Sequence, residues 1–302
     1  MHRWIGLTPH GFETMFLVDE SAKHNKGMAH ALGPTAMIVE YHRMQNKPGG
    51  RLDDFLRESV VPSVDKCLHN LAKTVRDGNN KSQSNDGRFK ISLLELCTQI
   101  FVHGTTTVFF GDKIWDVNHS FVESFELWER TNWKFMFQMP DLMSKDMVKA
   151  RDALIATFAG YLSIPTSERG DMCWFVKSVE GMLRDVGLDV GLEVDDMAKI
   201  PMLHHWAIVG NTYKVTFWAV AYLVHNKSLL ESVCEEIAPA STRFIDGEGN
   251  WNVCINESYT ADASRCPLLD AVISEVLRLG VSTALNSSFF SRNASPGKLH
   301  LV

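Results

Sequence analysis

Apolar residues recur at helical spacing along most of the chain, and polar stretches divide them into separate candidate elements. Alternation typical of strands is short and infrequent, so the pattern predicts a mainly α class. The expected helices cover residues 51–76 with a kink at Pro62, 91–110, 118–136, 144–162, 173–186, 201–226, 228–237 and 266–280.

Three stretches lack helical periodicity. Residues 1–50 are interrupted repeatedly by glycine and proline, residues 77–88 are polar, and residues 239–264 contain Gly247 and Gly249 among polar side chains. Such punctuation is typical of turns and loops. We therefore expect irregular structure in 1–50 and 239–264, and an exposed loop over 77–88.

The longest apolar run, 201–226, predicts a buried helix through the middle of the fold. At the usual rise, about 25 residues span roughly 37 Å, the width of a whole domain. Its centre carries Gly210, Asn211 and Thr212, where alanine or leucine would be a better helix former. A glycine lets a flat ligand approach the backbone, and a threonine hydroxyl bonded to a preceding carbonyl can bend a helix. The pattern predicts a small opening beside this midpoint.

Composition narrows the class of partner and the compartment. The chain has 302 residues, 45% hydrophobic and 22% charged, which is enough for a sizeable core. A net charge of −6 provides no basic field, so we expect no nucleic-acid partner. The six cysteines form no CxxC pair, which favours reduced thiols over a disulfide scaffold. No run of about 18 apolar residues occurs, so we expect neither a signal peptide nor a membrane span.

Generic catalytic motifs are absent from the sequence, including glycine-rich phosphate loops, HExxH and GxSxG. His204 and His205 are helix neighbours that point about 100° apart, so they cannot share one metal ion, and we expect no metal site. The acidic pairs Asp195–Asp196 and Glu235–Glu236 lie in polar segments, where such pairs usually form solvated faces. Neither acidic pair is given a catalytic role.

Glu275 and Arg278 form the remaining motif. They lie three residues apart in the apolar helix 266–280, on one face, where they can pair with each other and jointly hold a third segment. An exposed ion pair is the alternative, because any helix with this spacing can form one.

Taken together, these motifs resemble the cytochrome P450 family of haem-thiolate monooxygenases, in particular the branch with sterol hydroxylases and prostacyclin synthase. Trp206-Ala207, Gly210-Asn211-Thr212 and Phe217-Trp218 resemble the central helix of that branch, and Glu275-Val-Leu-Arg278 resembles its ExxR helix. The resemblance implies a partial cytochrome P450-like fold with a long central helix, in which 1–302 is a single partial domain.

The resemblance also implies roles for individual residues. Asn211 and Thr212 would be the catalytic groups that orient oxygen, water and protons at the iron, Ala207 and Gly210 would lie against the haem, and Glu275 with Arg278 would be the structural ExxR pair. The implied cofactors are haem and NADPH, the latter through the partner NADPH–cytochrome P450 reductase. The implied substrate is a hydrophobic small molecule of steroid, terpenoid or polyketide type, as in secondary-metabolite biosynthesis. Full-length relatives are bound to the endoplasmic reticulum membrane.

Departures from the family leave two hypotheses open. No cysteine stands in the haem-binding loop pattern FxxGxxxCxG, and the N-terminal anchor of the family is not recognised. The chain is expected to be either a monooxygenase whose sequence is truncated here, or a truncated, catalytically inactive remnant or ligand-binding pseudoenzyme.

Overall fold

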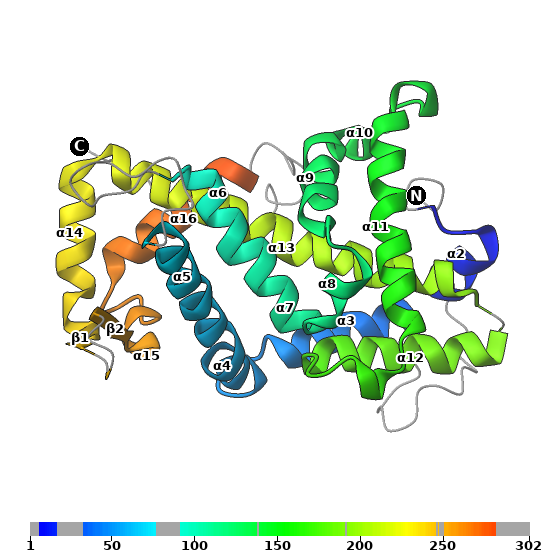
Figure 1. The fold of residues 1–302 in the computed structure, drawn as a ribbon, viewed down its shortest axis with the longest axis horizontal. Helices are drawn as coiled ribbons and strands as arrows, with labels where there is room; N and C mark the ends of the chain where they lie inside the picture. Colours follow the sequence, from blue (N-terminus) through cyan, green and yellow to red (C-terminus); the bar gives the residue numbers. More distant parts are fainter. Residues whose placement is uncertain are drawn as a thin grey trace, which may run out of the picture. The chain divides into compact units, whose positions relative to one another are not determined.

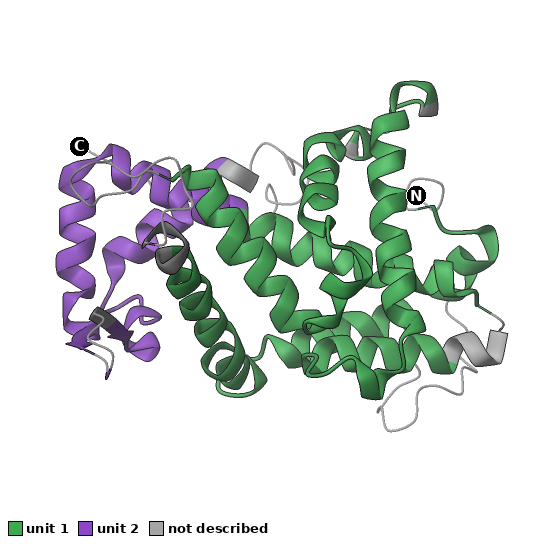
Figure 2. Cartoon of the chain, viewed as in Figure 1, with its two compact units in different colours: residues 1–213 green, residues 214–302 purple. Residues whose placement is uncertain are grey.

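The computed structural model describes residues 6–16, 33–76, 91–137, 139–190, 192–245, 247 and 251–281. The chain divides into two compact units, residues 1–213 (unit 1) and 214–302 (unit 2) (Figure 2). Helices make up most of the described residues, which confirms the mainly α class (Figure 1). The single domain expected over 1–302 stays a prediction, as does the loop at 77–88, which lies outside the described residues.

The described secondary-structure elements of unit 1 are all helices. Its elements are α2 (Pro9–Phe16), α3 (Pro34–Gln45), α4 (Arg51–Phe55), η1 (Leu56–Val60), α5 (Val61–Arg76), α6 (Leu93–Cys97), η2 (Thr98–Gly104), α7 (Thr105–Phe110), α8 (Lys113–Val117), α9 (Phe121–Thr131), α10 (Trp133–Met136), η3 (Asp141–Met143), α11 (Lys145–Ser163), η4 (Thr166–Glu168), α12 (Trp174–Val190) and the first part of α13 (Val194–His225).

Aromatic side chains fill the core of unit 1. Phe110, Phe121, Phe125 and Phe158 come from α7, α9 and α11 and are buried. Helix α11 packs against α8 and α9, α12 packs against α3, and α5 packs against η2. Removing this much apolar surface from water is the main driving force for assembling the unit.

A buried polar cluster joins the N-terminal segment to α13. The Asp196 carboxylate, 2% exposed, accepts hydrogen bonds from the Thr8 backbone N–H at 3.1 Å and from Lys199 Nζ at 2.7 Å. Burial alone would raise the pKa of Asp196, but the bonds from Lys199 and Thr8 outweigh it and the pKa is lowered. The expectation that Asp195–Asp196 forms a solvated face is therefore wrong for Asp196.

Unit 2 contains the rest of α13 and the two strands found in the described part of the chain. Its further elements are α14 (Lys227–Ile237), η5 (Ala238–Ala240), β1 (Ser241–Ile245), β2 (Trp251–Ile255), α15 (Glu257–Thr260) and α16 (Pro267–Val281). The strands pair antiparallel, with Ser241 opposite Ile255. Helix α14 packs against α16, and both Glu236 carboxylate oxygens accept backbone N–H bonds of 2.8 Å, from Leu268 and Leu269. Glu236 thus caps the N-terminus of α16 instead of forming a solvated face.

Most expected helices are confirmed, with shifted boundaries. Residues 51–76 are helical throughout, with the π-helical segment η1 just before Pro62. Residues 93–110 form one helical stretch with the π-helical segment η2 at its centre. The stretch 118–136 is interrupted at Asn132. Two expectations of irregular structure are wrong, because 1–50 contains α2 and α3 and 239–264 contains the hairpin and α15.

The central helix α13 is longer than expected and only partly buried. It begins at Val194, includes Pro201, and ends at His225. Its buried residues all lie between Asp196 and Gly210, whereas Trp218, Tyr222 and Val224 in its last turns are 49%, 42% and 62% exposed. The expectation of a buried helix holds only for the first half.

Among the described residues, one helical stretch meets the length and composition of a membrane span. It is Leu93–Phe110, and 44% of it is buried within the fold. Because core helices meet the same criteria, this stretch alone indicates no particular location.

Candidate functional site

The predicted site residues on α13 divide between an exposed face and a buried one. Ala207, Asn211 and Thr212 are exposed, and Gly210 is buried. Asn211 Nδ2 donates to the Ala207 carbonyl and Thr212 Oγ1 donates to the Ile208 carbonyl, both at 2.7 Å. The predicted bond from the threonine hydroxyl to a preceding carbonyl is therefore present, and both side chains lie along their own helix.

Gly210 lies against a carboxylate. A Cβ atom at this position would be 3.0 Å from Glu129 Oε1 and 3.1 Å from Trp206 Cδ1. Neither neighbour can move easily, because Glu129 Oε1 accepts a 2.8 Å bond from Asn132 Nδ2, and the Trp206 ring packs edge-on against Trp128 with centroids 5.5 Å apart. The small residue needed here therefore accommodates α9 and not an open cavity.

The Glu129 carboxylate on α9 also raises the pKa of Tyr213, which lies one turn further along α13. Burial, and then the charges of Glu129 and Glu126, raise the pKa of Tyr213. Tyr213 therefore stays a neutral phenol at physiological pH. Sequence reasoning singled out Gly210 but not Glu129, because no motif links positions 81 residues apart.

The two residues of the ExxR motif lie in unit 2. Arg278 Nε and Nη2 donate to Glu275 Oε2 and Oε1 at 2.7 and 2.6 Å, with the side chains 63% and 47% exposed. This hydrogen bond lowers the pKa of Glu275. Within the described part of unit 2, each charged group has the other as its partner, and no third segment joins them.

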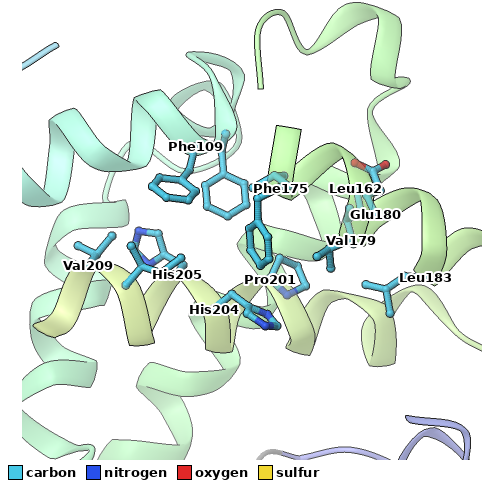
Figure 3. Close-up of a pocket in the computed structure, with 13 residues that line it drawn as sticks. Phe109, Leu162, Phe175, Val179, Glu180, Leu183, Pro201, His204, His205 and Val209 are labelled. Carbon is cyan, nitrogen blue, oxygen red and sulfur yellow. The ribbon is translucent and has the colours of Figure 1, made fainter. Parts of the chain in front are cut away.

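An apolar cavity lies in unit 1, between α7, α12 and α13 (Figure 3). It leaves about 20 Å³ in which the centre of a water molecule can lie, and this is room for about one water. Its lining residues are Phe109, Phe110, Leu162, Phe175, Val176, Val179, Glu180, Leu183, Pro201, His204, His205, Ile208 and Val209.

His205 is the most deeply buried polar group beside this cavity. Its Nε2 lies 2.7 Å from Thr106 Oγ1, and that hydroxyl donates its own hydrogen to the Val102 carbonyl at 2.5 Å. Thr106 must therefore accept from His205, which places the imidazole proton on Nε2. Burial lowers the pKa of His205 to about 3, so the ring is neutral at physiological pH.

His204 points to different neighbours, as Figure 3 shows. Its Nδ1 lies 2.7 Å from the Ile200 carbonyl, and its ring lies 5.5 Å from Phe175 and 5.2 Å from His42, measured between centroids. Burial lowers the pKa of His204 to about 4. In the described residues, no group of three or more histidine, cysteine, aspartate or glutamate side chains is arranged to hold a metal ion.

A buried ion-pair network borders the same cavity through Glu180. Its Oε1 accepts from Arg169 Nη2 and, at 2.7 Å, from Arg184 Nε, while the Arg169 guanidinium lies 4.6 Å from the centre of the Tyr161 ring. Burial alone would raise the pKa of Glu180, but the bonds from both arginines outweigh it and lower the pKa. The pair Glu180–Arg184 has helical spacing visible in the sequence, whereas Arg169 comes from a turn and carries no such signal.

These observations test whether the described residues fit a haem. The apolar cavity is far too small, and a larger cleft of about 660 Å³ is lined by charged side chains that include Glu58, Lys66, Asp112 and Lys113. Neither is lined by Ala207, Gly210, Asn211 or Thr212. Neither cavity is therefore a haem site. Ala207, Asn211 and Thr212 are exposed positions on α13 and line neither cavity.

Comparison with known proteins found no matching family model. Part of the chain is similar to a 5β-cholestane-3α,7α-diol 12α-hydroxylase of Sus scrofa, with 30% identity over 132 residues, which are 42% of this chain and 24% of the relative. The chain is similar to steroid hydroxylases. A second relative, a 7α-hydroxycholest-4-en-3-one 12α-hydroxylase of Oryctolagus cuniculus, is 35% identical over 83 residues, which are 26% of this chain and 15% of the relative.

Both similarities are partial. The chain spans about a quarter or less of the length of the curated relatives that it matches. Because both relatives are hydroxylases, the similarity supports an oxidoreductase at the level of the family, in loose agreement with the P450 resemblance.

Proposed function

We propose that this chain is part of a cytochrome P450-type monooxygenase that oxidises a hydrophobic small molecule, with steroids favoured over terpenoids and polyketides. The observation that carries the proposal is the partial similarity to two steroid 12α-hydroxylases. It is supported by the order of the motifs along the chain, with Gly210-Asn211-Thr212 on α13 followed by Glu275 and Arg278 on α16.

In this proposal the residues of α13 have separate tasks. Ala207, Asn211 and Thr212 are exposed on α13, where the Asn211 amide and the Thr212 hydroxyl donate to carbonyls of their own helix. Gly210 is buried and lies against the Glu129 carboxylate. Haem, NADPH, a reductase partner and association with the endoplasmic reticulum remain expectations that follow from the family.

A turnover assay tests the proposal. The protein encoded by the complete transcript that contains this sequence is incubated with a P450 reductase, NADPH and a panel of steroids, and products are analysed by mass spectrometry. We expect a product one oxygen atom heavier than a steroid substrate, formed only when NADPH is present. Turnover of terpenoids or polyketides alone would retain the monooxygenase and overturn the steroid preference.

The second candidate is a ligand-binding protein without turnover. It is favoured by one specific observation: the apolar cavity beside α13 has room for about one water molecule and is too small for a haem. Saturable steroid binding by a protein that contains no haem and consumes no NADPH would support this candidate and contradict the first.

A further inference from the structure

His204 lies beside a second histidine that comes from another helix of unit 1. His42 on α3 and His204 on α13 have ring centres 5.2 Å apart, with 32° between the ring planes. Both side chains are half-buried, so each keeps some contact with solvent. Phe175 on α12 packs against both rings, with its centre 4.2 Å from that of His42 and 5.5 Å from that of His204. Three helices thus hold two imidazoles close together.

The hydrogen bond of His204 leaves its second ring nitrogen with a lone pair. Nδ1 lies 2.7 Å from the Ile200 carbonyl, which can only accept, so the proton stays on Nδ1 and Nε2 is unprotonated. A hydrogen bond from the other ring nitrogen to a carbonyl is the arrangement that orients histidines in metal sites. Burial lowers the pKa of His204 to about 4 and also lowers the pKa of His42. Both rings are therefore in the neutral form that binds metal ions at physiological pH.

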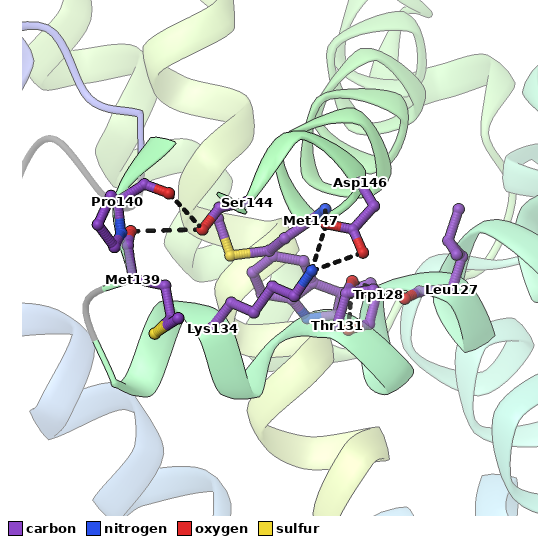
Figure 4. A network of polar contacts seen from close by, with 9 residues as sticks. All are labelled: Leu127, Trp128, Thr131, Lys134, Met139, Pro140, Ser144, Asp146 and Met147. Carbon is purple, nitrogen blue, oxygen red and sulfur yellow. Dashed lines mark hydrogen bonds and ion pairs between the residues drawn. The ribbon is translucent and has the colours of Figure 1, made fainter. Parts of the chain in front are cut away.

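The ring nitrogens of His42 differ from the polar groups at the start of α11. There, Lys134 Nζ bonds both Asp146 carboxylate oxygens at 2.7 Å (Figure 4), so a metal ion would have to displace the lysine to reach that carboxylate. Among the described residues, neither ring nitrogen of His42 has a hydrogen-bond partner, and its ring packs against those of Phe175 and His204. A metal ion can therefore bind His42 without displacing another group of the protein.

The spacing of the two rings fits an ion bound between them. Zinc binds imidazole nitrogen at about 2.0–2.1 Å, which places the ion about 3.2 Å from the ring centre. Two imidazoles at the tetrahedral angle around one ion then have centres about 5.2 Å apart, and the observed separation is 5.2 Å. Packed aromatic rings also lie about 4.5–7 Å apart. A variant that keeps the ring and removes its nitrogens is therefore the decisive control.

We propose that His42 and His204 form a site for a divalent transition-metal ion of the zinc type, with water completing its coordination. Imidazole suits zinc and copper, whereas magnesium and calcium require oxygen ligands. In the described part of the chain no third histidine, cysteine, aspartate or glutamate completes the set, so the remaining positions are open to solvent. The bound ion joins α3 to α13.

This site does not depend on the proposed monooxygenase function. It rests on side chains from three helices of unit 1, and it involves neither haem nor a steroid. Metal binding and the absence of turnover can both hold, so the two proposals fail separately.

Calorimetric titration of untagged, EDTA-treated 1–302 with Zn²⁺ tests the proposal. We expect one ion per chain and at least about tenfold weaker binding in His42→Phe, because losing even the hydrogen-bond partner of a ligand typically costs about 10–100-fold in affinity. This variant keeps an aromatic ring against Phe175. His204→Gln should weaken binding to a similar extent. His225→Phe is the matched control, since His225 is exposed at the end of α13, and it should bind as the unmodified chain does.

Two further measurements separate metal binding from packing. Circular dichroism first establishes that the variants keep the helix content of the parent. Because α3 and α13 meet only in the folded chain, Zn²⁺ should then raise the urea midpoint of the parent and leave that of His42→Phe unchanged. X-ray absorption of the one-to-one zinc complex of the parent, which needs no variant, should show two imidazole ligands. The absence of zinc binding, equal affinity in His42→Phe, or a single imidazole ligand would each overturn the proposal.

Discussion

Gly210→Ala distinguishes a packing role for this residue from a role against a haem. Alanine is favoured over glycine in a helix interior by about 1 kcal/mol, which would stabilise the protein if space allowed. The new Cβ, however, would lie 3.0 Å from Glu129 Oε1 and 3.1 Å from Trp206 Cδ1. Overpacking of this kind costs typically about 1–3 kcal/mol. We expect Gly210→Ala to leave the free energy of unfolding unchanged or to lower it by up to about 2 kcal/mol.

A double-mutant cycle with Glu129→Ala isolates the cause. Removing the carboxylate opens the space beside Gly210, so Gly210→Ala in that background should recover much of the helix-propensity gain. The expected coupling energy is about 1–2 kcal/mol, within the range found for residues in contact. Gly181→Ala on α12 is the matched control, because nothing lies within 4 Å of its Cβ position, and it should stabilise by up to about 1 kcal/mol.

The assay is urea unfolding of haem-free 1–302, followed by far-ultraviolet circular dichroism. A stabilisation by Gly210→Ala equal to that of Gly181→Ala, with no coupling to Glu129, would refute the packing role. In that case the glycine would have to be explained by a ligand.

Three further outcomes follow from the structure. The pKa of histidine is about 6.5 in the unfolded chain, whereas burial lowers the pKa of His205 in the folded chain to about 3. The contribution of neutral His205 to the free energy of unfolding is therefore complete above about pH 6.5 and is lost as the pH falls toward about 3. The urea midpoint should therefore fall as the pH falls through this range, and His205→Gln should make the midpoint less dependent on pH. An unchanged pH dependence in the variant would contradict the assignment of His205 as a buried neutral ring. Glu236→Ala should cost about 1–2 kcal/mol by uncapping α16, while the neighbouring Glu235→Ala should be nearly neutral; equal effects would remove the capping role. Glu275→Ala should leave the urea midpoint nearly unchanged because its ion pair is exposed, and a large loss would show that the pair holds a third segment after all.

The sequence predicted elements well where periodicity was long. Helices α5, α11, α14 and α16 carry repeated apolar positions that depend only on local spacing, and each is present. The hairpin was missed because Phe244, Ile245 and Val253 are all about half exposed, so its strands bury no single face and produce no alternation.

The candidate site was harder to predict because it depends on contacts between distant segments. The need for a small residue at Gly210 is visible in the sequence, but its neighbour Glu129 is not. Likewise, the chain alone gives no sign that Asp196 is held by Thr8, because the cluster depends on how the N-terminal segment meets α13. Acidic pairs that look solvated in a sequence become buried when another segment supplies hydrogen-bond donors.

The most direct test of the proposed function is a spectrum of the ferrous–carbon monoxide complex. It should be recorded on the protein expressed from the complete transcript, normalised to haem content. We expect the complete protein to give the red-shifted band of a thiolate-ligated haem, and we expect 1–302 alone, reconstituted with haem, not to give that band. A complete protein that binds no haem, or binds it without the thiolate band, would contradict assignment of this chain to a P450-type monooxygenase.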